Sequence, residues 1–139
     1  MYFLGIDVGT TGTKTAVVDE NGRVLGKGYR EYSLKTGAGG VVEQDPEDWW
    51  DAVVFSVRAA LEQLPDKENV RAISLSTQGG STLAVDSSYR PISLAYTWMD
   101  TRATRENAEI SASYADYIYK TSGWRSSAVF DPAKLRWMR

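Results

Sequence analysis

Near its start the chain carries the stretch Asp7-Val8-Gly9-Thr10-Thr11-Gly12-Thr13-Lys14, which joins two predicted strands at residues 2–7 and 13–19. A carboxylate ends the first strand, a turn of glycines and threonines follows, and a lysine enters the second strand. Glycine lets backbone N–H groups approach an anion closely, and successive amides can form an anion-binding nest. The pattern predicts a turn that binds the phosphates of a nucleoside triphosphate, with Asp7 holding Mg²⁺ through water. The alternative is an ordinary hairpin with a solvent-facing lysine.

The spacing in this turn differs from two common nucleotide-binding motifs. The Gly-x4-Gly-Lys-Ser/Thr spacing of a Walker A loop is absent. A Rossmann fingerprint would open a helix, whereas this turn leads into a strand.

Working outward from the turn, the first third of the chain is predicted to be a three-stranded antiparallel meander followed by a helix. Asn21-Gly22 predicts a tight hairpin in which both residues take positive φ, and residues 23–32 form the third strand. Residues 35–43 contain three glycines and are predicted to be a loop. A helix starts after Asp45, a capping residue, with Pro46 in its first turn. It presents an apolar stripe with helical spacing through Trp49, Val53, Val57, Ala60 and Leu64.

The rest of the chain is predicted to contain a buried strand, two shorter strands and helices. The buried strand covers residues 70–76, and a turn joins the shorter strands at 81–86 and 92–96. Helical patterns begin at Thr101, and Asp131-Pro132 opens a last helix that reaches the end of the sequence. We expect the chain to be the first part of a longer protein, because the last helix has barely two turns and no C-terminal cap.

Composition excludes several classes of function. The chain has 139 residues, of which 42% are hydrophobic and 24% charged, as in one soluble globular domain. Its formal net charge of -2 does not favour nucleic acid as a partner. It has neither cysteine nor histidine, which excludes disulfides, thiolate metal sites and a histidine base. No apolar run approaches the roughly 18 residues that cross a membrane, so no membrane partner and a cytoplasmic location are expected.

Two later segments carry candidate ligand-binding residues. In Gln78-Gly79-Gly80-Ser81, which follows a strand, a tight turn between strands is the alternative to a role in binding. In Trp98-Met99-Asp100-Thr101-Arg102 the tryptophan could form the wall of a small-molecule site, and the acid and the arginine could bind hydroxyls. The alternative for this segment is an internal Asp100–Arg102 pair that shapes the loop. Trp124, Arg125 and Phe130 could line the same cleft.

Five segments, in order along the chain, resemble the FGGY carbohydrate kinases of the actin-like superfamily, and within that family the xylulokinases. The resemblance covers nearly the whole chain and rests on segments at residues 5–14, 43–50, 73–80, 98–102 and 131–135. In glycerol kinases the two positions after Gln78 look like Arg-Glu, and in xylulokinases like Met-His. This chain has Gly79 and Gly80 there, which argues against a glycerol kinase, leaves strict xylulose specificity in doubt and indicates a roomier pocket or a larger polyol.

The resemblance implies a fold, a reaction and a set of roles. The fold would be a ribonuclease H-like, actin-like α/β fold with a mixed five-stranded sheet and helices on both faces. The chain would be a partial N-terminal, sugar-binding-side domain (1–139) of an ATP- and Mg²⁺-dependent sugar or polyol kinase. The C-terminal ATP-binding domain and the general-base aspartate would lie outside it, so the chain alone would be inactive.

The resemblance also assigns residues to ligands. Asp7 would be the acid associated with Mg²⁺, and Lys14 would reach the terminal phosphate. The other assigned residues are phosphate-binding Gly9, Thr10, Thr11 and Gly12, and substrate-binding Gln78, Gly79, Gly80, Trp98, Asp100 and Arg102.

A second hypothesis is a non-catalytic, actin-like module for nucleotide sensing or assembly, which would show ATP-dependent self-association or a protein partner instead of a sugar. A homodimer is compatible with either hypothesis. The segment at 98–102 favours the kinase, and a glycine-rich segment with an aspartate in any downstream sequence would discriminate between the two.

Overall fold

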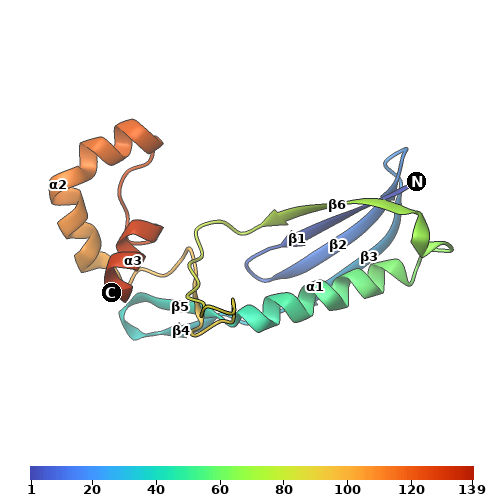
Figure 1. Cartoon of the computed structure of the whole chain (residues 1–139), viewed down its shortest axis with the longest axis horizontal. Coiled ribbons are helices and arrows are strands. Elements are labelled where there is room, and N and C mark those ends of the chain that lie inside the picture. Colours follow the sequence, from blue (N-terminus) through green and yellow to red (C-terminus); the bar gives the residue numbers. More distant parts are fainter. The chain divides into compact units, whose positions relative to one another are not determined.

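Apart from two short 3₁₀ turns, the chain runs through five strands, a helix, two strands and two helices, and the computed structural model describes all of residues 1–139 (Figure 1). The elements divide into two units. Unit 1 consists of Met1–Ser33 and Asp45–Gln78, and unit 2 consists of Leu34–Gln44 and Gly79–Arg139. The single domain expected from chain length is therefore two units, each built from two separate segments of the chain.

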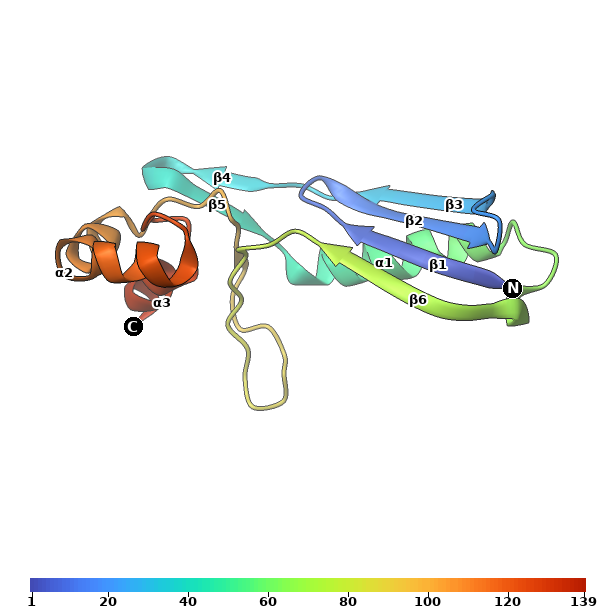
Figure 2. The ribbon, with the colours of Figure 1, turned by 90° about the horizontal axis from the view of Figure 1, so that it is seen from above.

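Unit 1 contains a four-stranded mixed sheet, whose strands lie side by side in Figure 2. The strand order is β3-β2-β1-β6, in which β1 pairs antiparallel with β2, β2 antiparallel with β3, and β6 parallel with β1. The predicted meander and the predicted buried strand are confirmed as elements. Their bounds are β1 Tyr2–Val8, β2 Gly12–Asp19, β3 Val24–Glu31 and β6 Val70–Thr77.

The hairpin between β2 and β3 forms where it was predicted, with a different turn. Gly22 takes a positive φ of 79°, while Asn21 does not. The Gly22 N–H donates to the Asp19 carbonyl over 3.0 Å, and the Asp19 carboxylate accepts from the N–H groups of Asn21 and Arg23, each over 2.9 Å. The aspartate therefore stabilises a wider turn that needs only one residue with left-handed backbone.

Helix α1, Pro46–Leu61, packs on one face of this sheet. It begins as predicted, since the Asp45 side chain accepts from the Glu47 N–H over 3.1 Å and Pro46 occupies the first turn. The predicted apolar stripe is displaced, because the most buried helix residues are Ala52, Ser56 and Ala60. Larger residues of the stripe, such as Val53 and Val57, pack around this line of small residues.

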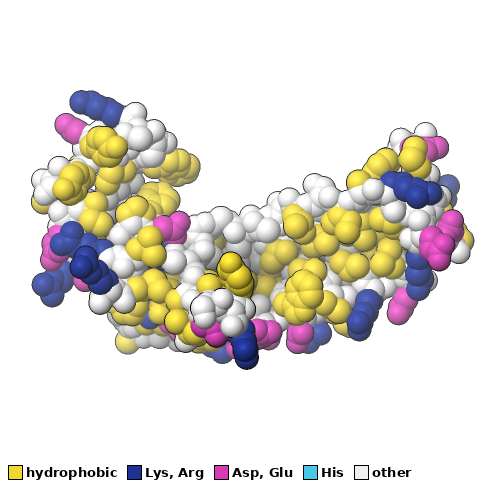
Figure 3. Space-filling model, in the orientation of Figure 1, with side chains coloured by type: hydrophobic (Ala, Val, Ile, Leu, Met, Phe, Trp, Pro, Cys, Tyr) yellow, Lys and Arg dark blue, Asp and Glu magenta, His cyan; other side chains and the backbone are white.

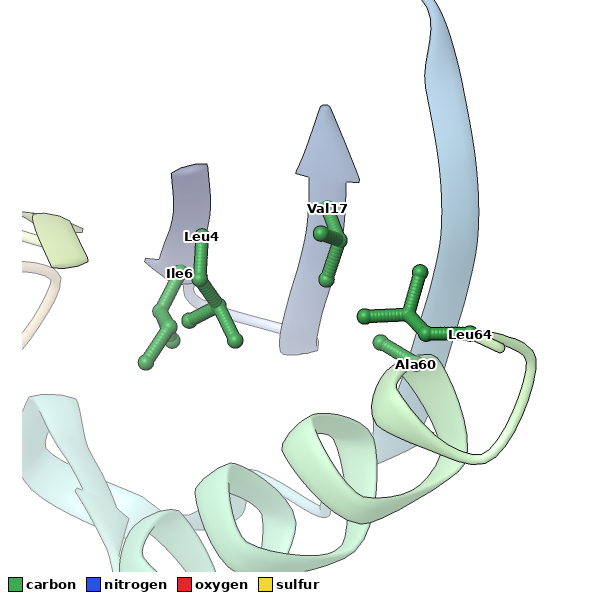
Figure 4. Packing of buried hydrophobic residues seen from close by; sticks show 5 residues of the cluster. All are labelled: Leu4, Ile6, Val17, Ala60 and Leu64. Carbon is green, nitrogen blue, oxygen red and sulfur yellow. The ribbon is translucent and has the colours of Figure 1, made fainter. Parts of the chain in front are cut away.

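Small residues bring the helix and the sheet unusually close. A Cβ atom at Gly28 would lie 1.9 Å from the Ser56 carbonyl oxygen, and one at Gly26 would lie 2.2 Å from that of Ala60. The core beside this contact consists of Leu4, Ile6, Val17, Ala60 and Leu64, which face one another in Figure 4.

The opposite face of the sheet carries no helix of unit 1. The predicted mixed α/β fold is present, but its sheet has four strands instead of five, and a helix of unit 1 covers one face instead of both. At the β6 edge Ile73 and Leu75 are each 66% exposed. Figure 3 shows hydrophobic side chains gathered at the surface of unit 1, on the right.

Unit 2 contains a small antiparallel sheet in the order β4-β5-β7, with bounds β4 Lys35–Gly37, β5 Val41–Gln44 and β7 Ala95–Tyr96. The prediction of a loop at 35–43 is wrong, because β4 and β5 form a hairpin whose second strand pairs with β7. The predicted strands at 81–86 and 92–96 are mostly irregular, apart from β7 and isolated bridges such as Thr82 to Tyr96.

Two helices complete unit 2, α2 Thr104–Ser122 and α3 Asp131–Met138. Helix α2 ends at Gly123, which has a φ of 75°. Helix α3 begins at Asp131-Pro132 as predicted. Neither these helices nor α1 combine the length and apolar composition that a membrane span requires.

Candidate functional site

Asp7 and Lys14 lie directly opposite each other on neighbouring strands, on the face of the sheet that α1 does not cover. They are register partners between β1 and β2, and Ser76 is the partner of Asp7 on β6. Because side chains alternate along a strand, Leu4 and Ile6 point to the core while Asp7 points to the opposite side. Asp7 and Lys14 are exposed. A hollow of about 670 Å³ opens here, lined among others by Asp7, Lys14, Lys27, Tyr29, Ser74 and Ser76.

The turn between β1 and β2 is held by Tyr32, which follows β3. The Tyr32 hydroxyl donates to the Gly9 carbonyl oxygen over 2.5 Å, and the Tyr32 N–H donates to the Thr11 carbonyl over 3.3 Å. In a planar trans peptide the C=O and the following N–H point in opposite directions. Because Tyr32 holds these two carbonyls, the N–H groups of Thr10 and Gly12 point away from Tyr32.

The Tyr32 hydroxyl is protonated at neutral pH, as any tyrosine is at its ordinary pKa. Burial, and to a smaller degree the negative charge of Asp7, raises the pKa of Tyr32, which extends this state to higher pH. Sequence reasoning missed this residue, because its contact lies 23 positions along the chain and no local pattern marks it.

The second glycine of the turn is required by its neighbours. A Cβ atom at Gly12 would lie 2.7 Å from the Arg30 carbonyl oxygen and 2.8 Å from the Tyr29 ring. The same ring lies 5.8 Å from the Lys14 ammonium, a distance compatible with a cation–π contact. Tyr29 therefore contributes to the shape of the turn and to the position of the lysine, another role that the sequence did not reveal.

Asp7 suits a magnesium ion that is shared with phosphate oxygens. The chain has no group of three acidic residues that could hold a metal by themselves. Mg²⁺ commonly keeps several waters and binds through one or two carboxylates plus substrate phosphates. One exposed carboxylate beside the turn for which phosphate binding is predicted fits that manner of binding.

In unit 2, Asp100 and Arg102 form an internal ion pair, and Arg102 also binds Glu43. Asp100 is fully buried, and its carboxylate accepts from the Val42 N–H over 2.8 Å and from Arg102 Nη2 over 2.6 Å. Arg102 Nη2 also donates to Glu43 over 2.6 Å. The guanidinium lies 4.7 Å from the Tyr96 ring centre and 5.0 Å from that of Trp137. For this pair the geometry favours the loop-shaping alternative over direct contact with hydroxyls.

These contacts shift both ionisation equilibria. Burial alone would raise the pKa of Asp100, but hydrogen bonds from Arg102 and Val42 outweigh burial and hold the pKa below the ordinary 3.8. Hydrogen bonding to Asp100 raises the pKa of Arg102 further above its usual range. Both groups are therefore charged across the physiological pH range.

Replacing Asp100 by asparagine is expected to destabilise unit 2 by about 2 kcal/mol at pH 7, because a buried charged hydrogen-bond partner is lost. Since the folded-state pKa is lowered, the unfolded state takes up the proton first. The stability is therefore present above pH 4 and is lost as the pH falls through the folded pKa. Hydrogen exchange of β5 and β7 amides at pH 7 and pH 3 measures both effects.

Asp116→Asn, an exposed substitution on α2, is the matched control and should change neither the stability at pH 7 nor its loss at acid pH. Equal acid sensitivity of Asp100→Asn and the unaltered chain would contradict this account of the pair.

The Gln78–Gly80 segment crosses from unit 1 to unit 2. The Gln78 N–H donates to the Val8 carbonyl over 2.8 Å, which fixes the end of β6 beside the start of the turn at residues 9–12. Gly80 has a φ of 70°, and a Cβ atom there would lie 3.3 Å from the Trp98 Cβ. A Cβ atom at Gly79 would meet nothing within 4 Å. The backbone therefore requires glycine at position 80, whereas position 79 has room for a side chain.

Trp98, adjacent to Gly80, is 44% exposed and could contact a ligand. Trp124 and Phe130 instead pack edge to face with ring centres 5.7 Å apart. The candidate residues thus form two groups. The turn at 7–14 belongs to unit 1, and Gly80, Trp98, Asp100 and Arg102 belong to unit 2.

Comparison with known proteins gives a consistent result. Residues 2–139 match the family model described as the FGGY family of carbohydrate kinases, N-terminal domain. A glycerol kinase of Thermococcus gammatolerans is 30% identical over 138 residues, and a gluconokinase of Bacillus subtilis is 32% identical over 138 residues. Each alignment covers 99% of this chain, but only 28% and 27% of the respective relative.

Among solved structures, a ligand-bound xylulose kinase from Lactobacillus acidophilus superposes with a TM-score of 0.90 at 28% identity, over 99% of this chain and 28% of that one. The chain therefore spans less than a third of the length of the relatives that it matches.

Proposed function

Because the chain belongs to the FGGY family of carbohydrate kinases, we propose that it is the first domain of a longer, cytoplasmic enzyme that transfers the γ-phosphoryl group of ATP to a hydroxyl of a sugar or polyol. The mixed α/β architecture is that of the actin-like ATPase fold of these kinases. A second, C-terminal domain would bind the adenosine and supply the aspartate that accepts the hydroxyl proton. The chain by itself would be inactive.

The observation that carries the proposal is the turn at residues 7–14. Two carbonyls of the turn accept hydrogen bonds from Tyr32, and Asp7 and Lys14 lie side by side on the face of the sheet that α1 does not cover. We assign phosphate binding to the backbone and hydroxyls of this turn, the terminal phosphate to Lys14, and magnesium to Asp7. The phosphate-binding residues of the turn are Gly9, Thr10, Thr11 and Gly12.

The sugar is assigned to the other group of residues. Gln78, Gly79, Gly80 and Trp98 would contact it, while Asp100 and Arg102 would shape the loop that carries Trp98. Since Gly79 and Gly80 offer no side chain, we propose a substrate larger than glycerol, such as a pentulose or a longer polyol.

Phosphoryl transfer leaves little covalent work for the protein, so positioning and charge neutralisation dominate. When bound, Mg²⁺ would neutralise charge on the β- and γ-phosphates. The amides aimed by Tyr32 would hold the phosphate oxygens in fixed directions before the reaction starts. Lys14 would add a point charge close to the transferred group. Substrate binding would then align a hydroxyl with the phosphorus.

The direct test is to co-express the chain with the proposed second domain and to measure ATP-dependent phosphorylation of pentuloses, gluconate, glycerol and longer polyols. We expect transfer to at least one of them, and none with either part alone. Absence of transfer to every substrate by a folded, associated pair would refute the enzymatic proposal.

Replacing Tyr32 by phenylalanine is expected to raise the KM for ATP about tenfold, because the Gly9 carbonyl loses its donor and the turn its orientation. Steady-state kinetics of the co-expressed pair measures the change. Tyr117→Phe is the control, since it removes the same hydroxyl from an exposed position on α2. An unchanged KM for ATP in a folded Tyr32→Phe variant would argue against an orienting role.

A further inference from the structure

Lys134 of α3 is a buried lysine that the proposed reaction does not use. Its side chain is 2% exposed, although lysine is rarely fully buried, because removing an ammonium from water is costly. A buried ammonium needs acceptors in the protein that replace the hydrogen bonds it would make to water. Burial lowers the pKa of Lys134, the Asp131 and Asp100 carboxylates favour its charged form, and Arg102 opposes it.

The ammonium is bound to two backbone carbonyls that lie far apart in the sequence. Lys134 Nζ donates to the Gly80 carbonyl over 2.7 Å and to the Thr97 carbonyl over 2.8 Å. Gly80 belongs to the glycine turn, and Thr97 immediately precedes Trp98. One side chain therefore ties together the two segments to which the sugar is assigned.

Other contacts already hold α3 in place. The Thr82 hydroxyl donates to Asp131 at the start of the helix over 2.6 Å. Near its end, the Trp137 ring packs edge to face on Tyr96, with ring centres 5.7 Å apart. Docking of α3 thus has anchors at both ends, and the buried ammonium between them adds a specific link to the two carbonyls.

We infer that Lys134 is a positioning residue that fixes Trp98 against the Gly80 turn and thereby sets the affinity for the sugar. The part of this inference that concerns the sugar rests on the proposed function. The spacing matters because a Cβ atom on Gly80 would lie only 3.3 Å from the Trp98 Cβ, so the two backbones are already in close approach. Without the ammonium, the Gly80 carbonyl would lose this donor and the Thr97 carbonyl would keep only the Asp100 N–H, so the link between the two segments would be lost.

The first test uses the 139-residue chain itself. Trp98 is observed by ¹⁹F NMR in protein labelled with 5-fluorotryptophan, its resonance assigned with Trp98→Phe. Lys134→Met is expected to shift or broaden the Trp98 resonance. Lys120→Met, which removes the same charge from an exposed position on α2, should leave it unchanged. If Lys134→Met does not fold, Lys134→Gln, which keeps one donor group, replaces it. An unmoved Trp98 resonance in the folded variant would overturn the positioning role.

The second test uses the co-expressed kinase. Lys134→Met is expected to raise the KM for the sugar about tenfold while the KM for ATP stays within twofold. Thr82→Val, which loosens α3 without touching Lys134, should leave the sugar KM unchanged. An equal rise in the sugar KM of both variants would mean that Lys134 only helps to dock α3, and would overturn the inference. If the unaltered pair shows no activity, the proposed function fails, and the Trp98 resonance alone decides the positioning role.

Discussion

Replacing Asp7 by asparagine is expected to lower the kcat of phosphoryl transfer about 10²–10³-fold, the loss typical of removing one preorganised electrostatic group. The physical reason is that Asp7 is the acidic residue beside the phosphate turn on the open face of the sheet. Because its side chain is exposed and the substitution keeps its shape, the stability of unit 1 should change by less than about 0.5 kcal/mol. Kinetics of the co-expressed pair and urea unfolding measure the two quantities.

The matched control is Asp51→Asn, which removes the same charge from the exposed surface of α1. Its kcat should be unchanged. Comparable losses in both variants would mean that Asp7 acts through the net charge of unit 1, and a fully active Asp7→Asn enzyme would place the magnesium elsewhere.

Replacing Gly28 by alanine is expected to cost unit 1 about 3 kcal/mol of unfolding free energy, the upper range for overpacking a tight contact. The added Cβ would lie 1.9 Å from the Ser56 carbonyl oxygen and 2.6 Å from its carbonyl carbon. Neither atom can move without displacing α1. The displacement would also strain the buried Thr15–Ser56 hydrogen bond of 2.8 Å. Hydrogen exchange of β2 and α1 amides reports the loss.

Gly5→Ala is the control in the same sheet, because a Cβ atom at that position would meet nothing within 4 Å. Its effect should stay below about 1 kcal/mol. If both variants lose the same unfolding free energy, the cost of Gly28→Ala does not come from the close contact between helix and sheet.

The elements that the sequence predicted are those with local signals. Strand β2 is marked by β-branched residues, β3 by the Asn21-Gly22 turn before it, and α1 by the Asp45 cap and Pro46. The hairpin at residues 35–44 could not be predicted in this way, because part of its stability comes from the pairing of β5 with β7, as between Glu43 and Tyr96. That partner strand lies about fifty positions away, and without it the glycine-rich sequence by itself indicates a loop.

The candidate site follows the same division. Asp7 and Lys14 belong to one short motif, so the sequence places them side by side, and the Asp100–Arg102 pair is one of the two alternatives that the sequence allows for residues 98–102. The contacts of Tyr32 and Lys134 could not be predicted, since each side chain binds backbone carbonyls 23 to 54 positions away.

Each unit draws on two separate stretches of chain, which imposes an order on synthesis at the ribosome. Unit 1 can close as soon as β6 emerges and pairs with β1, at Thr77. The β4–β5 hairpin, made earlier, must wait until Ala95–Tyr96 has been translated before its open edge is covered. During that interval the nascent polypeptide exposes unpaired backbone groups at β5, which could pair with the wrong strand.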